Sequence, residues 1–176
     1  MRALVTGGAG FIGSHLVDRL LQAGHQVRVF DNFSTGRRRF LVGAQANDQF
    51  ELIEADLMYE QQIDVAMRGV DFVWHLAANA DVRFGTDQAR RDLEQNTIAT
   101  SNVLEAMRKN EVRHIAFSST GSIYGEASVI PTSEDCPMPV QTSLYGASKL
   151  ACEGMISAYC EGFDMRAWIF RFVSIL

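Results

Sequence analysis

The chain has 176 residues, 47% of them hydrophobic and 21% charged, so it can bury the core of one globular domain. Its formal net charge of −5 argues against a nucleic acid partner and leaves room only for a local anion pocket. Cys136, Cys152 and Cys160 lack metal-ligand and redox spacing, so we expect no metal and reduced thiols in a cytoplasmic protein. No apolar run approaches the roughly 20 residues of a membrane span. No signal peptide is expected, because Gly7 interrupts the first apolar run.

Short apolar runs alternate with segments of helical periodicity along the chain. The runs predict buried strands at residues 3–6, 26–30, 51–54, 72–75, 114–118 and 166–172. The periodic segments predict helices at residues 11–23, 59–67, 87–109 and 143–161. This order predicts an α/β fold, a Rossmann-type doubly wound parallel sheet flanked by helices, with ligands beyond the carboxyl ends of the strands. Two long irregular stretches, 32–49 and 125–142, are predicted to be functional loops.

Four glycines separate the first predicted strand from the first predicted helix: Gly7, Gly8, Gly10 and Gly13. This spacing permits a tight turn and a close approach of a pyrophosphate to the backbone, with the amides of the following helix facing the phosphates. A glycine-rich turn without a ligand has the same pattern. Asp31 favours a dinucleotide, because a carboxylate at the end of the second strand accepts hydrogen bonds from the adenosine ribose.

The same carboxylate bears on the choice of cofactor. Asp31 repels the additional phosphate of NADP, whereas Arg37, Arg38 and Arg39 could attract it. We favour NAD, since the carboxylate occupies the discriminating position and the arginines fit a solvated loop.

Two further segments follow predicted strands. Asp56 is a candidate partner for the adenine amino group, or alternatively a helix N-cap ahead of Tyr59. Residues 75–80, with the sequence HLAANA, put small side chains where bulk would block a cofactor. His75 is interpreted as a packed strand residue rather than a base, because its neighbours are apolar.

A pair of residues points to proton transfer. Tyr145 and Lys149 lie four apart at the start of a predicted helix and therefore on one face. An ammonium there, together with a cationic nicotinamide, would lower the pKa of the tyrosine and let its phenolate act as a base. An exposed helical face is the alternative. Ser118, Ser119 and Thr120 at the end of the fifth strand favour the catalytic interpretation, because a hydroxyl there can relay the proton.

Taken in order, the segments TGGAGFIGSHL, DNFSTGRR, ADL, HLAA, RRDLEQNTIATSNVLEAM, FSSTGSIYG, YGASK and FRFVSI span the whole chain. With them the sequence resembles the extended short-chain dehydrogenase/reductase superfamily, in particular its NAD-dependent nucleotide-sugar epimerase/dehydratase branch. The resemblance implies that Tyr145 is the catalytic base, that Lys149 assists it and holds the nicotinamide ribose, and that Thr120 completes the triad.

The resemblance also implies a full NAD-binding set, with Asn96 near the active site and the strand end at Phe172 and Val173 passing the nicotinamide. The expected cofactor-binding residues are Gly7, Gly10, Phe11, Ile12, Gly13, Asp31, Asn32, Asp56, Leu57, Leu76, Ala77, Ala78, Asn96, Ser118, Tyr145, Lys149, Phe172 and Val173.

In such enzymes the phenolate takes the proton of the sugar C4 hydroxyl while a hydride moves to NAD, and the keto sugar is re-reduced from its other face. The resemblance therefore implies an NAD-dependent nucleotide-sugar epimerase, similar to UDP-glucose 4-epimerases or UDP-glucuronate epimerases, with a UDP-sugar as substrate. A UDP-sugar decarboxylase, a 4,6-dehydratase and an NADP-linked sugar reductase are alternatives, as is a non-catalytic dinucleotide-binding protein. Gly121 and Ser122 disfavour dehydration, because dehydratases carry an Asp-Glu pair there; Ser174 replaces an asparagine of many members.

Members of this branch are considerably longer. The resemblance implies that residues 1–176 form an NAD-binding Rossmann domain and that a carboxyl-terminal substrate domain is missing, so this chain is expected to be inactive alone. It also implies a homodimer through the helices at 87–109 and 143–161, whose apolar residues could alternatively pack on the sheet.

Overall fold

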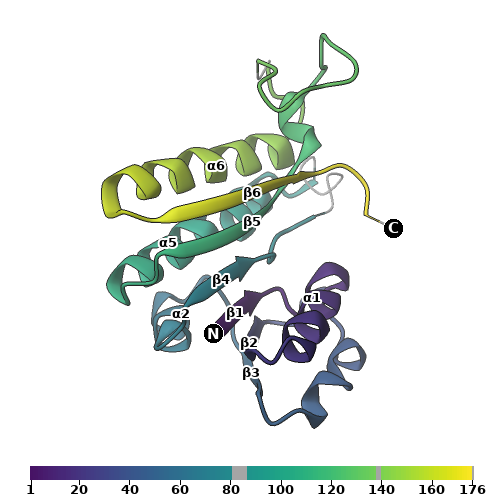
Figure 1. Cartoon of the computed structure of the whole chain (residues 1–176). Coiled ribbons are helices and arrows are strands. Elements are labelled where there is room, and N and C mark those ends of the chain that lie inside the picture. The colour runs from purple at the N-terminus through teal and green to yellow at the C-terminus, as the bar shows by residue number, and fades with distance from the viewer. Residues whose placement is uncertain (81–86, 138–139, 176) are drawn as a thin grey trace.

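A parallel sheet forms the centre of the computed structural model, which describes residues 1–80, 87–137 and 140–175 (Figure 1). Its strands follow the order β3-β2-β1-β4-β5-β6, and every neighbouring pair is parallel. The strands are β1 (Arg2–Thr6), β2 (Gln26–Asp31), β3 (Phe50–Glu54), β4 (Phe72–His75), β5 (His114–Thr120) and β6 (Arg166–Phe172). The order reverses between β1 and β4, which is the arrangement of a doubly wound sheet and confirms the predicted fold class.

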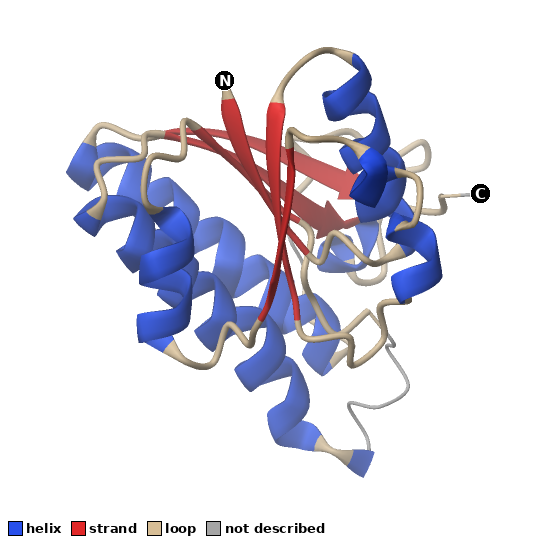
Figure 2. Cartoon of the chain, turned by 90° about the horizontal axis from the view of Figure 1, so that it is seen from below, coloured by secondary structure: helices blue, strands red, loops and turns tan. Residues whose placement is uncertain are grey.

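Helices cover both faces of this sheet (Figure 2). The α-helices and the π-helical segment η3 are α1 (Phe11–Gln22), α2 (Glu60–Met67), α4 (Ala89–Asp92), η3 (Leu93–Ile98), α5 (Ala99–Lys109) and α6 (Leu144–Phe163). Short 3₁₀ helices are η1 (Arg38–Leu41), η2 (Ala44–Ala46) and η4 (Gly121–Tyr124). Helix α5 packs against both α2 and α6 on one face, whereas α1, η1 and η2 lie together on the other.

The sheet has a hydrophobic core on each face, and this explains why the strands are continuous apolar runs. Successive side chains of a strand point to opposite faces. In β1, Leu4 belongs to the core under α2, α5 and α6, while Ala3 and Val5 belong to the core under α1. All three are fully buried. A strand covered on both faces needs a continuous apolar run, and this is the pattern from which the strands were predicted.

The predicted elements are all present, with two differences that affect the site. The helix predicted at 87–109 contains the π-helical segment η3, in which the residue spacing per turn is wider than in an α-helix. Strand β5 also extends two residues beyond the predicted end, as far as Thr120, because its pairing with β6 continues to Phe172. The longer β5 thus depends on a contact between distant segments.

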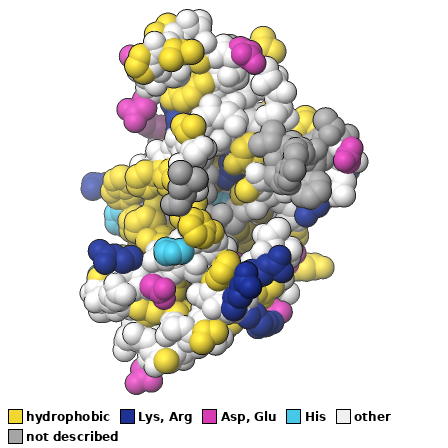
Figure 3. Space-filling view, turned by 90° about the vertical axis from the view of Figure 1, so that its right-hand side faces the viewer, with side chains coloured by type: hydrophobic (Ala, Val, Ile, Leu, Met, Phe, Trp, Pro, Cys, Tyr) yellow, Lys and Arg dark blue, Asp and Glu magenta, His cyan; other side chains and the backbone are white. Residues whose placement is uncertain are grey.

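The surface carries no single dominant charge on the face shown in Figure 3, where Lys and Arg side chains form local groups among hydrophobic and acidic ones. None of the helices in the described part of the chain combines the length and hydropathy that a bilayer-spanning segment needs. All three cysteines are free thiols.

Stability measurements can test the packing of the glycine loop. In Gly13→Ala, the new Cβ would lie 2.2 Å from the carbonyl oxygen of Gly7 and 2.8 Å from the Cα of Gly8. Because both contacts are with backbone, we expect the free energy of unfolding to fall by about 1–3 kcal/mol. Gly154→Ala is the control: it lies on the exposed side of α6, a Cβ there meets nothing within 4 Å, and alanine should stabilise the helix by about 1 kcal/mol. Urea unfolding measures both, and a stable Gly13→Ala variant would contradict the close packing.

Candidate functional site

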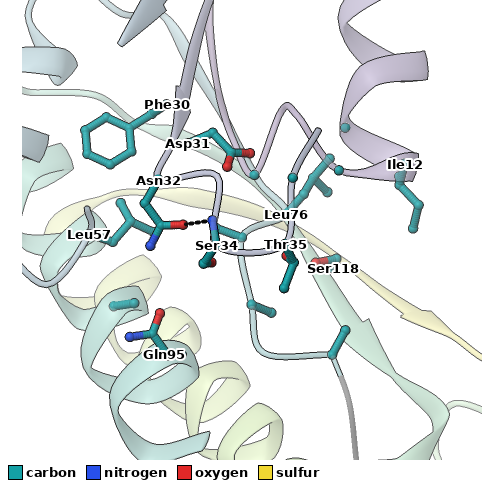
Figure 4. A pocket seen from close by; sticks show the side chains of 18 of the residues that line it. Ile12, Phe30, Asp31, Asn32, Ser34, Thr35, Leu57, Leu76, Gln95 and Ser118 are labelled. Atoms are coloured by element: carbon teal, nitrogen blue, oxygen red, sulfur yellow. Dashed lines mark hydrogen bonds between the residues drawn. The ribbon is translucent and has the colours of Figure 1, made fainter. Parts of the chain in front are cut away.

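A cavity of about 380 Å³ opens at the carboxyl ends of the central strands (Figure 4). Most of the predicted cofactor-binding residues line it: Gly7, Gly10, Phe11, Ile12, Gly13, Asp31, Asn32, Asp56, Leu57, Leu76, Ala77, Ala78 and Ser118. The remaining lining residues were not in the predicted set, namely Phe30, Ser34, Thr35, Gly36, Ala55, Gln95, Ala99 and Ile175, whereas Ala80 belongs to the segment 75–80 that was expected to leave room for a cofactor. This is the position beyond the strand ends where doubly wound sheets bind ligands.

The glycine loop shapes one wall of the cavity. Gly7 has a φ of +70°, and a Cβ there would lie 2.7 Å from the amide nitrogen of Ala77. Gly10 caps α1 without a side chain, and the first turn of α1 contains no acidic residue. The loop therefore leaves the positive end of a helix of 12 residues available to an anion.

Asp31 fastens this loop as well as facing the cavity. Its carboxylate accepts hydrogen bonds from the amides of Ala9 and Phe33, both at 2.8 Å, and it is only 8% exposed. A carboxylate has about four acceptor positions, so two amides leave capacity for a ribose hydroxyl. The structure thus adds a loop-holding contact to the role expected from the sequence.

The arginines after Asp31 have partners of their own. Arg38 forms an ion pair with Glu54 and lies over the ring of Phe33 at 4.2 Å from its centroid. The guanidinium of Arg39 lies 5.3 Å from the ring centroid of Phe40. These contacts fit the interpretation of the arginines as a solvated loop face.

Asp56 is not the N-cap of the next helix, so that alternative was wrong. The N-cap residue of α2 is Tyr59. The carboxylate of Asp56 instead accepts from the amide of Met58 at 2.9 Å and from the side chain of Asn32 at 3.0 Å. These bonds close a turn before the helix begins, and both Asp56 and Asn32 line the cavity. In Figure 4, Gln95 extends from its helix toward the same end of the cavity as Asn32.

His75 is a packed strand residue, as the sequence indicated. It is fully buried between the hydroxyls of Thr6 at 2.6 Å and Thr100 at 3.0 Å. Burial, with a smaller contribution from Lys149, lowers the pKa of His75 to about 3. The imidazole is therefore neutral at physiological pH and bound on both nitrogens.

Of the three hydroxyls at the end of β5, only Thr120 is placed beside Tyr145. The hydroxyl of Ser118 donates to the carbonyl of His75 at 3.3 Å, and that of Ser119 donates to Glu153. Thr120 hydrogen-bonds the phenol of Tyr145. The register of the sheet places Phe172 opposite Thr120.

The predicted acidity of Tyr145 is not present in this structure. Burial raises the pKa of its phenol above the usual value of about 10, Asp92 raises it further, and the hydrogen bond with Thr120 opposes the rise. Lys149 is not among the groups that shift the pKa of Tyr145 here, and its Nζ donates to the carbonyl oxygen of Ser118 at 2.8 Å. The contribution expected from a cationic nicotinamide stays a prediction.

Lys149 is almost completely buried, with 2% of its surface exposed. Its ammonium also lies 4.6 Å from the ring centroid of Phe117. Burial lowers its pKa from 10.5 to about 8, against the opposing effects of Cys152 and Glu153. The ammonium of Lys149 thus loses its proton at a lower pH than the phenol of Tyr145.

Three further predicted residues, Asn96, Phe172 and Val173, lie outside the cavity lining. Asn96 is buried behind it, and its side chain donates to Ser148 at 2.9 Å and accepts from the amide of Asn79 at 2.8 Å. Val173 is 89% exposed, whereas Ile175 lines the cavity. Asn96 therefore hydrogen-bonds Ser148 and Asn79 and does not line the cavity in this structure.

Replacing Lys149 by methionine tests its burial. Because folding lowers the pKa of Lys149 from 10.5 to about 8, the unfolded chain holds this proton more tightly between those pH values. As the pH rises through this interval, the free energy of unfolding of the wild-type chain should therefore increase relative to that of Lys149→Met. Below pH 8 the wild-type chain should be least stable relative to the variant. Urea unfolding of both proteins at several pH values measures it; a difference independent of pH would rule out a lowered pKa.

The model of the NAD-dependent epimerase/dehydratase family matches residues 3–176. A UDP-glucose 4-epimerase of Corynebacterium glutamicum is 38% identical over 176 residues, covering 99% of this chain and 51% of the relative. UDP-glucuronic acid decarboxylase 1 of Danio rerio is 37% identical, covering 94% of this chain and 40% of the relative. The solved UDP-glucose 4-epimerase of Thermus thermophilus in complex with NAD has a TM-score of 0.88 and 37% identity, over 97% of this chain and 54% of that one.

The chain thus spans about half the length of the epimerases that it matches. The match extends over the glycine loop, the cavity and the segment with Tyr145 and Lys149. The chain belongs to the NAD-dependent epimerase/dehydratase family.

Proposed function

We propose that this chain is the NAD-binding domain of a nucleotide-sugar epimerase of the UDP-glucose 4-epimerase type. The observation that carries the proposal is the position of one cavity, bounded by the glycine loop and Asp31, next to the cluster of Thr120, Tyr145 and Lys149. In this proposal the substrate domain belongs to the part of the relatives that this chain does not match. The homodimer expected through the helices at 87–109 and 143–161 stays a prediction.

The residues around the cavity fit NAD, the cofactor of the family. The uncapped start of α1 suits the pyrophosphate, and Asp31 suits the adenosine ribose. Asn32 and Asp56 supply polar groups at the adenine end. Lys149, whose Nζ lies at the carbonyl of Ser118, would hold the nicotinamide ribose. When bound, NAD supplies a hydride acceptor.

The protein's own groups supply the proton transfer. Tyr145 is the base that takes the proton from the sugar hydroxyl, and Thr120 is hydrogen-bonded to its phenol. Ser122 holds Thr120, since its amide donates to the threonine oxygen at 3.1 Å and the two hydroxyls lie 3.2 Å apart. Ser122 thus orients the threonine, which fits an epimerase better than a dehydratase that needs an acid there.

The cofactor site can be tested on this chain with Asp31→Asn. Asparagine keeps an acceptor for one loop amide but removes the charge that binds the ribose hydroxyls, so we expect NAD binding to weaken about 10- to 100-fold. Discrimination against NADP should fall at the same time. Asp48→Asn, in an exposed loop, is the control and should bind NAD as the wild type does. Isothermal titration calorimetry measures all of these affinities; unchanged NAD affinity in Asp31→Asn would overturn the assignment.

The reaction can be tested in the whole protein, extended to the length of its relatives, with UDP-glucose and UDP-glucuronate as substrates. Tyr145→Phe should lower turnover by about 10²- to 10⁴-fold with NAD binding retained, because it removes the general base. Tyr159→Phe, near the far end of α6, should leave turnover unchanged. Product analysis identifies the reaction. Release of carbon dioxide from UDP-glucuronate would replace the epimerase assignment by a decarboxylase.

A further inference from the structure

A buried polar cluster lies behind the predicted catalytic tyrosine, formed by Asn79, Asp92, Asn96 and Ser148. Each of the four is at most 7% exposed. The Oδ1 atom of Asp92 accepts from the side chain of Asn79 at 2.7 Å and from that of Asn96 at 3.5 Å. The cluster joins the segment after β4 to α4, η3 and α6.

One atom of this cluster is unsatisfied. The Oδ2 atom of Asp92 has no hydrogen-bond partner among the described residues, although the residue is only 1% exposed. A buried carboxylate oxygen without a donor costs free energy, and native structures contain few such groups. The packing of α4 against α6 does not require a carboxylate at this position, because an amide of the same shape could bind Asn79 and Asn96 through its carbonyl oxygen.

The cluster reaches Tyr145 through two bonds. The side chain of Asn96 donates to the hydroxyl of Ser148 at 2.9 Å, and this hydroxyl donates to the main-chain carbonyl of Tyr145 at 2.8 Å. In the other direction, Asn96 accepts from the amide of Asn79 at 2.8 Å, directly before the cavity-lining Ala80. Asp92 therefore braces both the first turn of α6 and one wall of the cavity.

We propose that Asp92 is a positioning residue of the Tyr145 site, which holds the first turn of α6 and the cavity wall through Asn96 and Asn79 and keeps a buried carboxylate behind the tyrosine, where it acts on the phenol. The inference rests on the proposed role of Tyr145 as the base. A carboxylate close by disfavours the phenolate, and Asp92 raises the pKa of Tyr145 accordingly. In the chain without cofactor, Asp92 thus adds to the burial that keeps Tyr145 neutral.

The other charged groups around the tyrosine are directed elsewhere. On α6, Lys149 donates to the carbonyl of Ser118, and Glu153 is paired with Arg171 of β6 at 2.9 Å. His75 of β4 is neutral, because its pKa is lowered to about 3. Among the described residues, Asp92 is thus the acidic group whose charge acts on Tyr145.

Asp92→Asn tests the charge while keeping the shape. Its carbonyl oxygen can accept from Asn79 and Asn96, and its amide replaces an oxygen that has no partner among the described residues. In the 176-residue chain labelled with ¹³C at the tyrosine ring, and with the Tyr145 signal assigned by Tyr145→Phe, we expect the pKa of Tyr145 to fall. Glu94→Gln is the control: Glu94 lies two residues further on and pairs with Arg90, so the pKa should stay at the wild-type value.

A pKa of Tyr145 that is the same in wild type and Asp92→Asn would overturn the inference.

Asn96→Ala tests the bracing of α6 while Asp92 is left in place, and it does not depend on the folding of Asp92→Asn. It should speed hydrogen exchange at the amides of Gly146 and Ala147, and unchanged protection there would also overturn the inference. The titration needs neither NAD nor substrate, so its failure leaves the proposed function standing. Failure of Tyr145→Phe to slow turnover would contradict the proposed function and leave the titration result intact.

Discussion

The close backbone contact between the glycine loop and the segment after β4 is the constraint on which the cavity depends. A Cβ at Gly7 would lie 2.7 Å from the amide of Ala77, and one at Gly13 would lie 2.2 Å from the carbonyl of Gly7. Only glycine permits the two strand ends and the start of α1 to meet at these distances. Asp31 completes the arrangement, because it ties β2 to the loop through the amide of Ala9.

Burial then sets the chemistry of the groups beside the cavity. Desolvation disfavours any charged form, so it raises the pKa of Tyr145 and lowers that of Lys149 to about 8. The protein's own groups thus favour the neutral form of the tyrosine. A positive charge that enters the cavity would favour the phenolate, which couples the basicity of Tyr145 to the occupancy of the site.

Polar side chains in the interior have two kinds of function in this fold. His75 and the two threonines that bind it satisfy one another and join β1 and β4 to α5. Asp92 and Asn96 also join distant elements, but one carboxylate oxygen has no partner among the described residues. A buried carboxylate oxygen without a donor is unfavourable, so packing alone gives no reason for a carboxylate here, whereas the proposed role beside Tyr145 gives one.

The sequence alone determined the strands, the helices and the position of the glycine loop. Buried parallel strands need continuous apolar runs, and the glycine spacing has a local steric cause, so both are visible without contacts between distant segments. Only the tertiary structure decided that Lys149 turns to Ser118 and that Asn96 reaches the first turn of α6 through Ser148; it also showed that Asp56 is not the N-cap and that η3 is π-helical. The contacts of Lys149 and Asn96 are hydrogen bonds between segments far apart in the chain. No local pattern of residue types specifies such a contact.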